Sequence, residues 1–147
     1  MGGGSRRDAA DTIPEHLILA DTSAWIEFLR SSEHPADRTL TRLVDQEAAV
    51  GVTGPVIMEV LAGLRERDVP EAREMLLSLP LLPIAGLADF EEATGLYRRC
   101  RAGGETVRKL LDCLIAAVAI REEVPLLHND MDFDVIARHT ELGIYRD

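Results

Sequence analysis

The fold is decided by residues 17–26, which read LILADTSAWI. The apolar run Leu17–Ala20 is typical of a strand that is buried on both faces, and it ends at Asp21. Thr22 or Ser23 can then cap a helix whose apolar residues follow a helical spacing. This stretch therefore predicts a buried strand that passes, through an acid, directly into a helix.

The same alternation of strands and helices continues along the rest of the chain. It predicts an α/β fold, in which a central, mostly parallel sheet is flanked by helices on both faces. Strands are expected at 17–20, 48–52, 81–85, 125–128 and 143–145, and helices near 22–29, 36–47, 55–64, 71–79, 88–101, 106–122 and 132–139.

Length and composition favour one domain with an aliphatic core. The chain has 147 residues, of which 46% are hydrophobic but 4% aromatic. Residues 1–16 begin with MGGGS and differ from the rest, which indicates a flexible leader or a cloning remnant. We therefore expect a single domain at 17–147.

The charge is acidic, with 26 Asp and Glu against 16 Lys and Arg and a net charge of −10. This argues against a protein that holds nucleic acid by overall electrostatic attraction. A polyanionic substrate would need a bound metal ion or a local Arg cluster. The alternative is that acidity serves only to keep a small protein in solution.

Cys100 and Cys113 each lie in a helical pattern without CxxC spacing, which favours two buried thiols in a reducing cytoplasm over a disulfide or metal site. The sequence shows no membrane-spanning run and no apolar signal-peptide segment. A cytoplasmic protein without membrane contact is expected.

Four acids are placed unusually relative to these elements. Asp21 and Asp130 each follow a predicted strand, where ligand sites form in open α/β sheets. Glu59 and Asp112 lie on helices among apolar neighbours, where a charge is costly unless it is paired or binds a metal. If the four carboxylates converge, a hard cation such as Mg²⁺ or Mn²⁺ would relieve their repulsion.

Each acid also has a purely structural interpretation. Asp21 could be the N-cap of the following helix, and Glu59 could be an exposed acid favoured by a helix dipole. Asp112 could pair with Arg108, one turn earlier on the same helix face. Spacing alone does not decide between these interpretations and a shared site.

Four segments, in order, resemble the acidic segments of PIN-domain nucleases. The resemblance extends from Leu17 to about Tyr145, and the short chain looks most like the VapC-type toxins of toxin–antitoxin pairs. The segments are DTSAWI at 21–26, PVIMEV at 55–60, LDCLIAAVA at 111–119 and NDMDF at 129–133.

The resemblance implies roles for particular residues. It makes Asp21, Glu59, Asp112 and Asp130 the catalytic, metal-binding acids. Asp132 becomes an alternative fourth acid or an added ligand, and Ser23 would hold a metal-bound water or a ligand carboxylate. One residue departs from the family pattern: His128 stands where Thr or Ser commonly precedes the fourth acidic segment, and we expect a hydrogen-bonded histidine there rather than a catalytic base.

The resemblance also implies an activity and partners. One or two Mg²⁺ or Mn²⁺ ions would activate a water for RNA hydrolysis, leaving 5′-phosphate and 3′-OH ends. The substrate would be a structured RNA such as a tRNA. A homodimer is expected, together with a cognate antitoxin that covers an apolar groove and brings a basic residue near the acids. Trp25, Phe28 and Leu29 are candidates for the antitoxin surface, although core packing explains them equally well.

A group of cations is a candidate RNA-binding surface, because it surrounds the Gly103–Gly104 break near Asp112. A solvated helix end explains these cations equally well. The group consists of Arg98, Arg99, Arg101, Arg108 and Lys109.

Three other functions remain open at this point. A catalytically inactive PIN-like module could bind RNA or protein, but the four acids are retained. A phosphoacceptor receiver domain would need a Lys after a late strand, and none follows residues 126–128. A wholly structural interaction domain would leave the placement of the acids unexplained.

Overall fold

The computed structural model describes residues 16–47 and 49–146, and it contains a three-stranded parallel sheet. The strands are β1 (Ile18–Ala20), β2 (Val50–Gly51) and β3 (Leu126–Leu127), in the order β2-β1-β3. Ile18 is in register with Val50, and Ala20 with Leu127. The predicted leader, apart from residue 16, and the predicted start of the second strand at residue 48 lie outside the described residues.

Two further segments extend the sheet by single bridges rather than by full strands. Val52 bridges Leu81 on one edge, and Leu126 bridges Ile144 on the other, both in parallel. The strand predicted at 81–85 is thus shorter than expected: its two ladder hydrogen bonds both involve Val52, and the neighbouring chain enters α3 at Gly54. The strand predicted at 143–145 is likewise reduced to one bridge.

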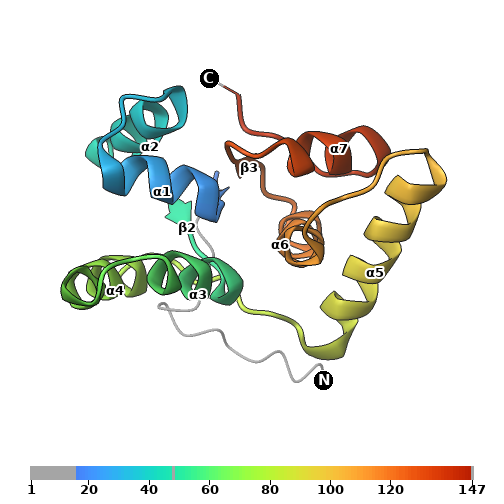
Figure 1. Ribbon diagram of the computed structural model, residues 1–147, viewed down its shortest axis with the longest axis horizontal. Helices are drawn as coiled ribbons and strands as arrows, with labels where there is room; N and C mark the ends of the chain where they lie inside the picture. Colours follow the sequence, from blue (N-terminus) through green and yellow to red (C-terminus); the bar gives the residue numbers. More distant parts are fainter. Residues whose placement is uncertain (1–15, 48, 147) are drawn as a thin grey trace, which may run out of the picture.

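Helices flank this short sheet and make up most of the described chain (Figure 1). Figure 1 shows α6 near the centre, with α1 to α4 on one side of it and α5 and α7 on the other. The prediction of an α/β fold with a parallel sheet between helices is confirmed. The helices are α1 (Thr22–Arg30), α2 (Pro35–Asp45), α3 (Gly54–Ala62), the 3-10 turn η2 (Glu66–Asp68), α4 (Val69–Leu77), α5 (Gly86–Ala102), α6 (Leu110–Arg121) and α7 (Met131–His139).

Helix α1 is capped by Asp21 rather than by Thr22 or Ser23. The Asp21 backbone is extended, and its carboxylate accepts a hydrogen bond from the N–H of Ser23 at 3.0 Å. Prediction of the cap at Thr22 or Ser23 was therefore wrong by one or two residues. Because β1 ends at Ala20, the same aspartate closes the strand and starts the helix.

Helix α6 begins at Leu110, four residues later than predicted. Val107 is buried, and Lys109 has an extended backbone whose N–H donates to the Asp132 carboxylate at 3.0 Å. These two contacts keep residues 106–109 out of the helix. The segment before α6 therefore lies against the start of α7, where Arg108 and Lys109 contact Asp132.

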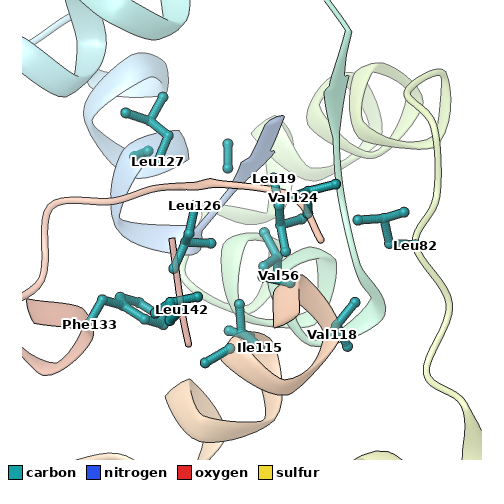
Figure 2. Close-up of a cluster of buried hydrophobic side chains, with 14 of the residues drawn as sticks. Leu19, Val56, Leu82, Ile115, Val118, Val124, Leu126, Leu127, Phe133 and Leu142 are labelled. Atoms are coloured by element: carbon teal, nitrogen blue, oxygen red, sulfur yellow. The ribbon is translucent and has the colours of Figure 1, made fainter. Parts of the chain in front are cut away.

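The core lies between the sheet and α6, and it is aliphatic, as the composition predicts (Figure 2). Figure 2 shows Leu19, Val56, Ile115 and Leu126 converging from separate elements. Trp25 is also part of this core and is 0% exposed, so its proposed place on an antitoxin surface was wrong. No described helix is long and apolar enough to cross a membrane.

Candidate metal centre

The first two acids of the site are set by neighbouring parallel strands. Asp21 follows β1, and Asp130 follows β3 after two intervening residues. The strands are held in register at this end by the Asp21 N–H, which donates to the carbonyl of Leu127 at 2.9 Å. Because the strands are parallel, their carboxyl ends meet at one edge of the sheet. Both acids therefore face the same region.

Two helices bring the next two acids to that edge. Glu59 lies in the second turn of α3, whose start is fixed by Pro55, and Asp112 lies in the first turn of α6. One carboxylate oxygen from each of Asp21, Glu59 and Asp112 lies within 4.8 Å of the other two. This spacing fits oxygen ligands around one cation.

A second group of acids shares Asp112 with the first. Asp112, Asp130 and Asp132 also place one oxygen each within 4.8 Å of one another. The structure thus brings all four predicted acids and the alternative acid Asp132 into one cluster. Their role as metal ligands stays a prediction.

Two carboxylates of the cluster are deeply buried. Asp21 is 3% exposed and Asp112 is 2% exposed. Asp21 Oδ1 and Asp112 Oδ2 are buried and find no hydrogen-bond partner among the described residues. Such atoms are costly to bury. Two unpartnered oxygens within one acidic cluster are therefore available to a cation.

The electrostatics of the cluster follow from this burial. Burial and the neighbouring charge of Asp21 raise the pKa of Asp112 to about 8. Burial also raises the pKa of Asp21, although hydrogen bonds from Ser23 and Thr22 oppose the shift. A pKa of about 8 favours the protonated form of Asp112 at neutral pH while no divalent cation is bound.

Asp132 differs from these two acids because it is fully hydrogen-bonded. Its Oδ1 accepts from Arg108 Nε at 3.1 Å, and its Oδ2 accepts from the backbone N–H of Lys109 at 3.0 Å. Burial would raise the pKa of Asp132, but these hydrogen bonds outweigh it and the pKa is lowered. The lowered pKa means that Asp132 keeps its charge although it offers an oxygen within 4.8 Å of Asp112.

Comparison with known proteins agrees with this geometry. The family model described as "PIN domain" matches residues 18–139. The chain is also 44% identical to ribonuclease VapC11 of Mycobacterium tuberculosis over 128 residues, which cover 86% of this chain and 96% of VapC11. The chain belongs to the VapC ribonucleases of the PIN-domain family.

Two solved VapC structures share the fold at low sequence identity. VapBC2 from Rickettsia felis, bound to a promoter DNA fragment, has a TM-score of 0.68 at 17% identity and covers 88% of this chain and 97% of its own. The Sarcin-Ricin loop cleaving toxin VapC20 of Mycobacterium tuberculosis has a TM-score of 0.64 at 20% identity and covers 86% of this chain and 98% of its own.

A purely structural role was suggested for Asp21 as a helix cap and for Asp112 as a partner of Arg108. Asp21 is indeed a helix N-cap, but the cap uses Oδ2 and leaves Oδ1 unpartnered. The suggested pairing of Asp112 with Arg108 is wrong, because Arg108 binds Asp130 and Asp132 instead. Capping therefore does not exclude Asp21 from a metal site, and Asp112 has no arginine partner.

Two hydroxyl groups position the acids on the β1 side. Ser23 Oγ donates to Asp21 Oδ2 at 2.7 Å and accepts from the N–H of Asn129 at 2.8 Å. Thr22 Oγ1 donates to Glu59 Oε1 at 3.0 Å. Ser23 was predicted as a supporting residue from the sequence, whereas Thr22 was not, although its place directly after Asp21 was a usable signal.

His128 replaces the Thr or Ser that commonly precedes the fourth PIN segment. Its Nδ1 accepts from the N–H of Asp130 at 3.1 Å, and its Nε2 lies 3.4 Å from Asp134 Oδ1. The ring also packs against Phe133. The prediction of a hydrogen-bonded histidine is confirmed, and His128 supplies a local acceptor for the backbone of Asp130.

The predicted cation group divides into two parts. Arg108 and Lys109 reach the acids: Arg108 Nη2 lies 3.1 Å from Asp130 Oδ1, and Lys109 Nζ lies 3.3 Å from Asp130 Oδ2. By contrast, the three arginines of α5 lie exposed on its last turns. Arg99 pairs with Glu92 and Glu141, and Arg101 lies over the ring of Tyr97, 5.8 Å from its centroid.

Proposed function

We propose that this chain is a divalent-metal-dependent endoribonuclease that acts in the cytoplasm as the toxin of a toxin–antitoxin pair. The observation that carries the proposal is the pair of buried, unpartnered oxygens, Asp21 Oδ1 and Asp112 Oδ2, within one acidic cluster. The donor set consists of carboxylates, which suit Mg²⁺ or Mn²⁺ better than softer metals. Membership of the VapC ribonucleases supports RNA as the substrate.

The acids have distinct tasks in this proposal. Asp21, Glu59, Asp112 and Asp130 hold the metal. Asp132 has both oxygens engaged by Arg108 and Lys109, so it orients the second group of acids and is a poorer candidate for direct ligation. The bound ion supplies the charge that activates a water and shields the scissile phosphate. Hydrolysis by this route leaves 5′-phosphate and 3′-OH ends.

Ser23 and Thr22 support this arrangement by fixing two of the acids. Ser23 joins Asp21 to the backbone that precedes Asp130, because its hydroxyl contacts both Asp21 and the N–H of Asn129. Thr22 holds the Glu59 side chain, which comes from a different helix. These hydroxyls keep the two strand ends and α3 in a fixed relation.

A structured RNA such as a tRNA is the proposed substrate. The net charge of −10 disfavours attraction by the whole surface, so local cations must contact the phosphates. Arg108 and Lys109 are exposed beside the acids and are the first candidates. Arg98, Arg99 and Arg101 form a second exposed group at the end of α5. The related VapC20 is described as cleaving the Sarcin-Ricin loop, which is consistent with recognition of a folded RNA element.

A groove between α1 and α4 is the proposed docking site for an antitoxin. It has a volume of about 760 Å³, and its apolar lining includes Phe28, Leu29, Leu64 and Met75. Four acids also line it, so a partner segment with apolar and basic residues would fit. Its acids are Glu33, Asp37, Asp68 and Glu71.

A homodimer is also proposed, through the exposed apolar face at the start of α5. Leu87 is 71% exposed and Phe90 is 52% exposed, and they lie one turn apart on the same helix. Burying such residues between two copies is favourable. Sedimentation analysis of Phe90→Glu should show a shift from dimer to monomer, and an unchanged dimer would exclude this face.

The test of the activity is cleavage of total RNA by purified protein, with Mg²⁺ or with EDTA. Sequencing that maps the 5′ ends should show discrete cleavage sites that carry a 5′-phosphate and depend on Mg²⁺. Asp112→Asn should remove them. Undiminished cleavage in EDTA would contradict the metal role, and RNA binding without cleavage would favour an inactive PIN-like module.

A further inference from the structure

Lys109 is the only lysine in the chain: the other 15 of the 16 basic residues are arginines. This single lysine lies in the segment before α6, at the acid cluster. Lysine and arginine differ physically. An ammonium is a compact charge on a flexible stem, whereas a guanidinium is a planar fork that suits fixed, paired hydrogen bonds.

The Lys109 ammonium contacts Asp130, an acid of the second group. Its Nζ lies 3.3 Å from Asp130 Oδ2, and it is also attracted by Asp112 and by Glu59. Asp130 belongs to one group of acids, Glu59 to the other, and Asp112 to both. A single monovalent cation therefore interacts with acids of both groups.

The Lys109 side chain is 56% exposed, and among the described residues its ion pair is with Asp130. An ion pair of this exposure contributes little to stability. Withdrawal of the ammonium would expose Asp130 Oδ2 without opening the core.

Arg108 is bound differently from its neighbour. Its Nε donates to Asp132 Oδ1 and its Nη2 to Asp130 Oδ1, both at 3.1 Å. The same guanidinium thus joins two carboxylates by two separate hydrogen bonds. Asp132 Oδ2 is fixed from the backbone of Lys109, so this link does not depend on the lysine side chain.

We propose that the Lys109 ammonium occupies the cation position of the metal-free site and is displaced when a divalent ion binds, whereas Arg108 stays in place as a positioning residue. A divalent ion would compete with the ammonium for the Asp130 carboxylate, whose Oδ2 the ammonium contacts, and the two cations would repel each other. Arg108 leaves that oxygen free and keeps Asp130 and Asp132 aligned. This inference rests on the proposed function only in requiring a divalent-metal site.

The first test is calorimetric titration of Mn²⁺ into the full chain without RNA. Lys109→Met removes the competitor and should tighten Mn²⁺ binding on the order of tenfold. Arg108→Gln removes the alignment and should weaken it on the order of tenfold. Arg138→Gln, a matched control that removes an exposed ion pair with Glu105, should leave it within about twofold. Circular dichroism would verify that each variant is folded.

The decisive feature is that the two substitutions should change the Mn²⁺ affinity in opposite directions. Both substitutions remove one positive charge near the acids, so simple electrostatics would tighten binding in both variants. Tighter binding in Arg108→Gln, or unchanged binding in Lys109→Met, would overturn the proposal. Absence of Mn²⁺ binding to every variant would overturn both the proposal and the metal site. Normal metal binding without RNA cleavage would overturn the proposed function alone.

A second test uses the fact that the chain has one lysine. Incorporation of ¹⁵N-lysine gives one side-chain ammonium resonance, which belongs to Lys109. In the metal-free protein the resonance should show a hydrogen-bonded ammonium, and saturating Mg²⁺ should move it to the position of a solvated one. A resonance that does not change at saturating Mg²⁺ would show that the ammonium stays on Asp130, contrary to the proposal.

Discussion

Two buried aspartates of this protein have nearly equal exposure but opposite electrostatics. Asp89, on α5, is 3% exposed, and Asp112, on α6, is 2% exposed. Asp89 accepts hydrogen bonds from Arg121 Nε at 3.0 Å and from the N–H of Ala85 at 2.7 Å. Asp112 has one oxygen without a partner among the described residues.

The pKa values of the two acids reflect this difference in compensation. For Asp89, burial acts to raise the pKa, but hydrogen bonds from Arg121 and Ala85 outweigh it and the pKa is lowered. For Asp112, burial and the acids Asp21 and Asp130 together raise the pKa to about 8. Because the two acids are almost equally buried, the difference in pKa comes from their hydrogen bonds and neighbouring charges rather than from burial itself.

The largest expected effect is on RNA cleavage, which should be lost on substitution of Asp112 but not of Asp89. Asp112→Asn and Asp21→Asn should each reduce Mg²⁺-dependent RNA cleavage by at least about a hundredfold, because each removes a ligand charge. Asp89→Asn should keep most of the activity at a temperature where it is folded. The rate of cleavage of an end-labelled RNA measures the effect. An equal loss of rate in all three variants would show that Asp112 and Asp21 differ from Asp89 in no way that matters for activity.

The free energy of unfolding should respond in the opposite way: it should fall on substitution of Asp89 but not of Asp112. Asp89→Asn leaves Arg121 without its main carboxylate, and we expect the free energy of unfolding to fall by about 2 kcal/mol, a moderate value because Arg121 is partly exposed. The melting temperature should fall by about 5–10 °C. Thermal unfolding followed by circular dichroism measures the change. A melting temperature equal to that of the parent would show that the Asp89 pair does not stabilise the fold.

The metal-free protein should gain stability from Asp112→Asn, and the gain should grow with pH. Folding raises the pKa of Asp112 from the ordinary value of 3.8 to about 8. The free energy of unfolding of the parent protein is therefore least affected by Asp112 below pH 3.8, and it falls as pH rises from there towards about 8. Asparagine has no such titration. Unfolding in EDTA should show a small gain at about pH 5 and a gain of about 4 °C or more at about pH 8. A gain that shrinks with rising pH would contradict this sign.

The smallest effect is expected from the hydroxyl that positions Asp21. Ser23→Ala removes two hydrogen bonds, to Asp21 and from Asn129, but leaves every acid in place. RNA cleavage should fall about threefold to tenfold, because ligand orientation is lost and ligand charge is kept. Thr41→Ala, which removes a hydroxyl that contacts Asp37 in α2, is a matched control and should not slow cleavage. A loss as large as that of Asp21→Asn would make Ser23 a ligand instead.

Much of the fold could be predicted from short sequence patterns. The apolar run before Asp21 and the Gly54-Pro55 start of α3 were sufficient to place β1 and that helix. The start of α6 could not be predicted in this way. Residues 106–109 have a helical pattern, but the Asp132 carboxylate binds the backbone of Lys109, and that acid lies 23 residues away in sequence. Local pattern does not report such a contact.

In the candidate site, too, features set by neighbouring residues could be predicted from the sequence, whereas contacts between distant segments could not. The position of acids after strands predicted that Asp21 and Asp130 share an edge, because parallel strands end together. The partners of Arg108 depend instead on how α7 packs against the segment before α6, so helix spacing wrongly suggested Asp112. The burial of Trp25 was equally undetermined, since an amphipathic pattern does not say which partner covers its apolar face.

Asp112 is expected to hold a proton in the metal-free protein because no divalent cation neutralises it, and counting the protons released by a metal ion tests this directly. Calorimetric titration of Mg²⁺ at about pH 7, in two buffers with different ionisation enthalpies, measures the protons released on binding. The parent should release close to one proton per ion, since the pKa of Asp112 is raised to about 8. Asp89→Asn should release the same number. Binding of Mg²⁺ to the parent without release of protons would contradict the account.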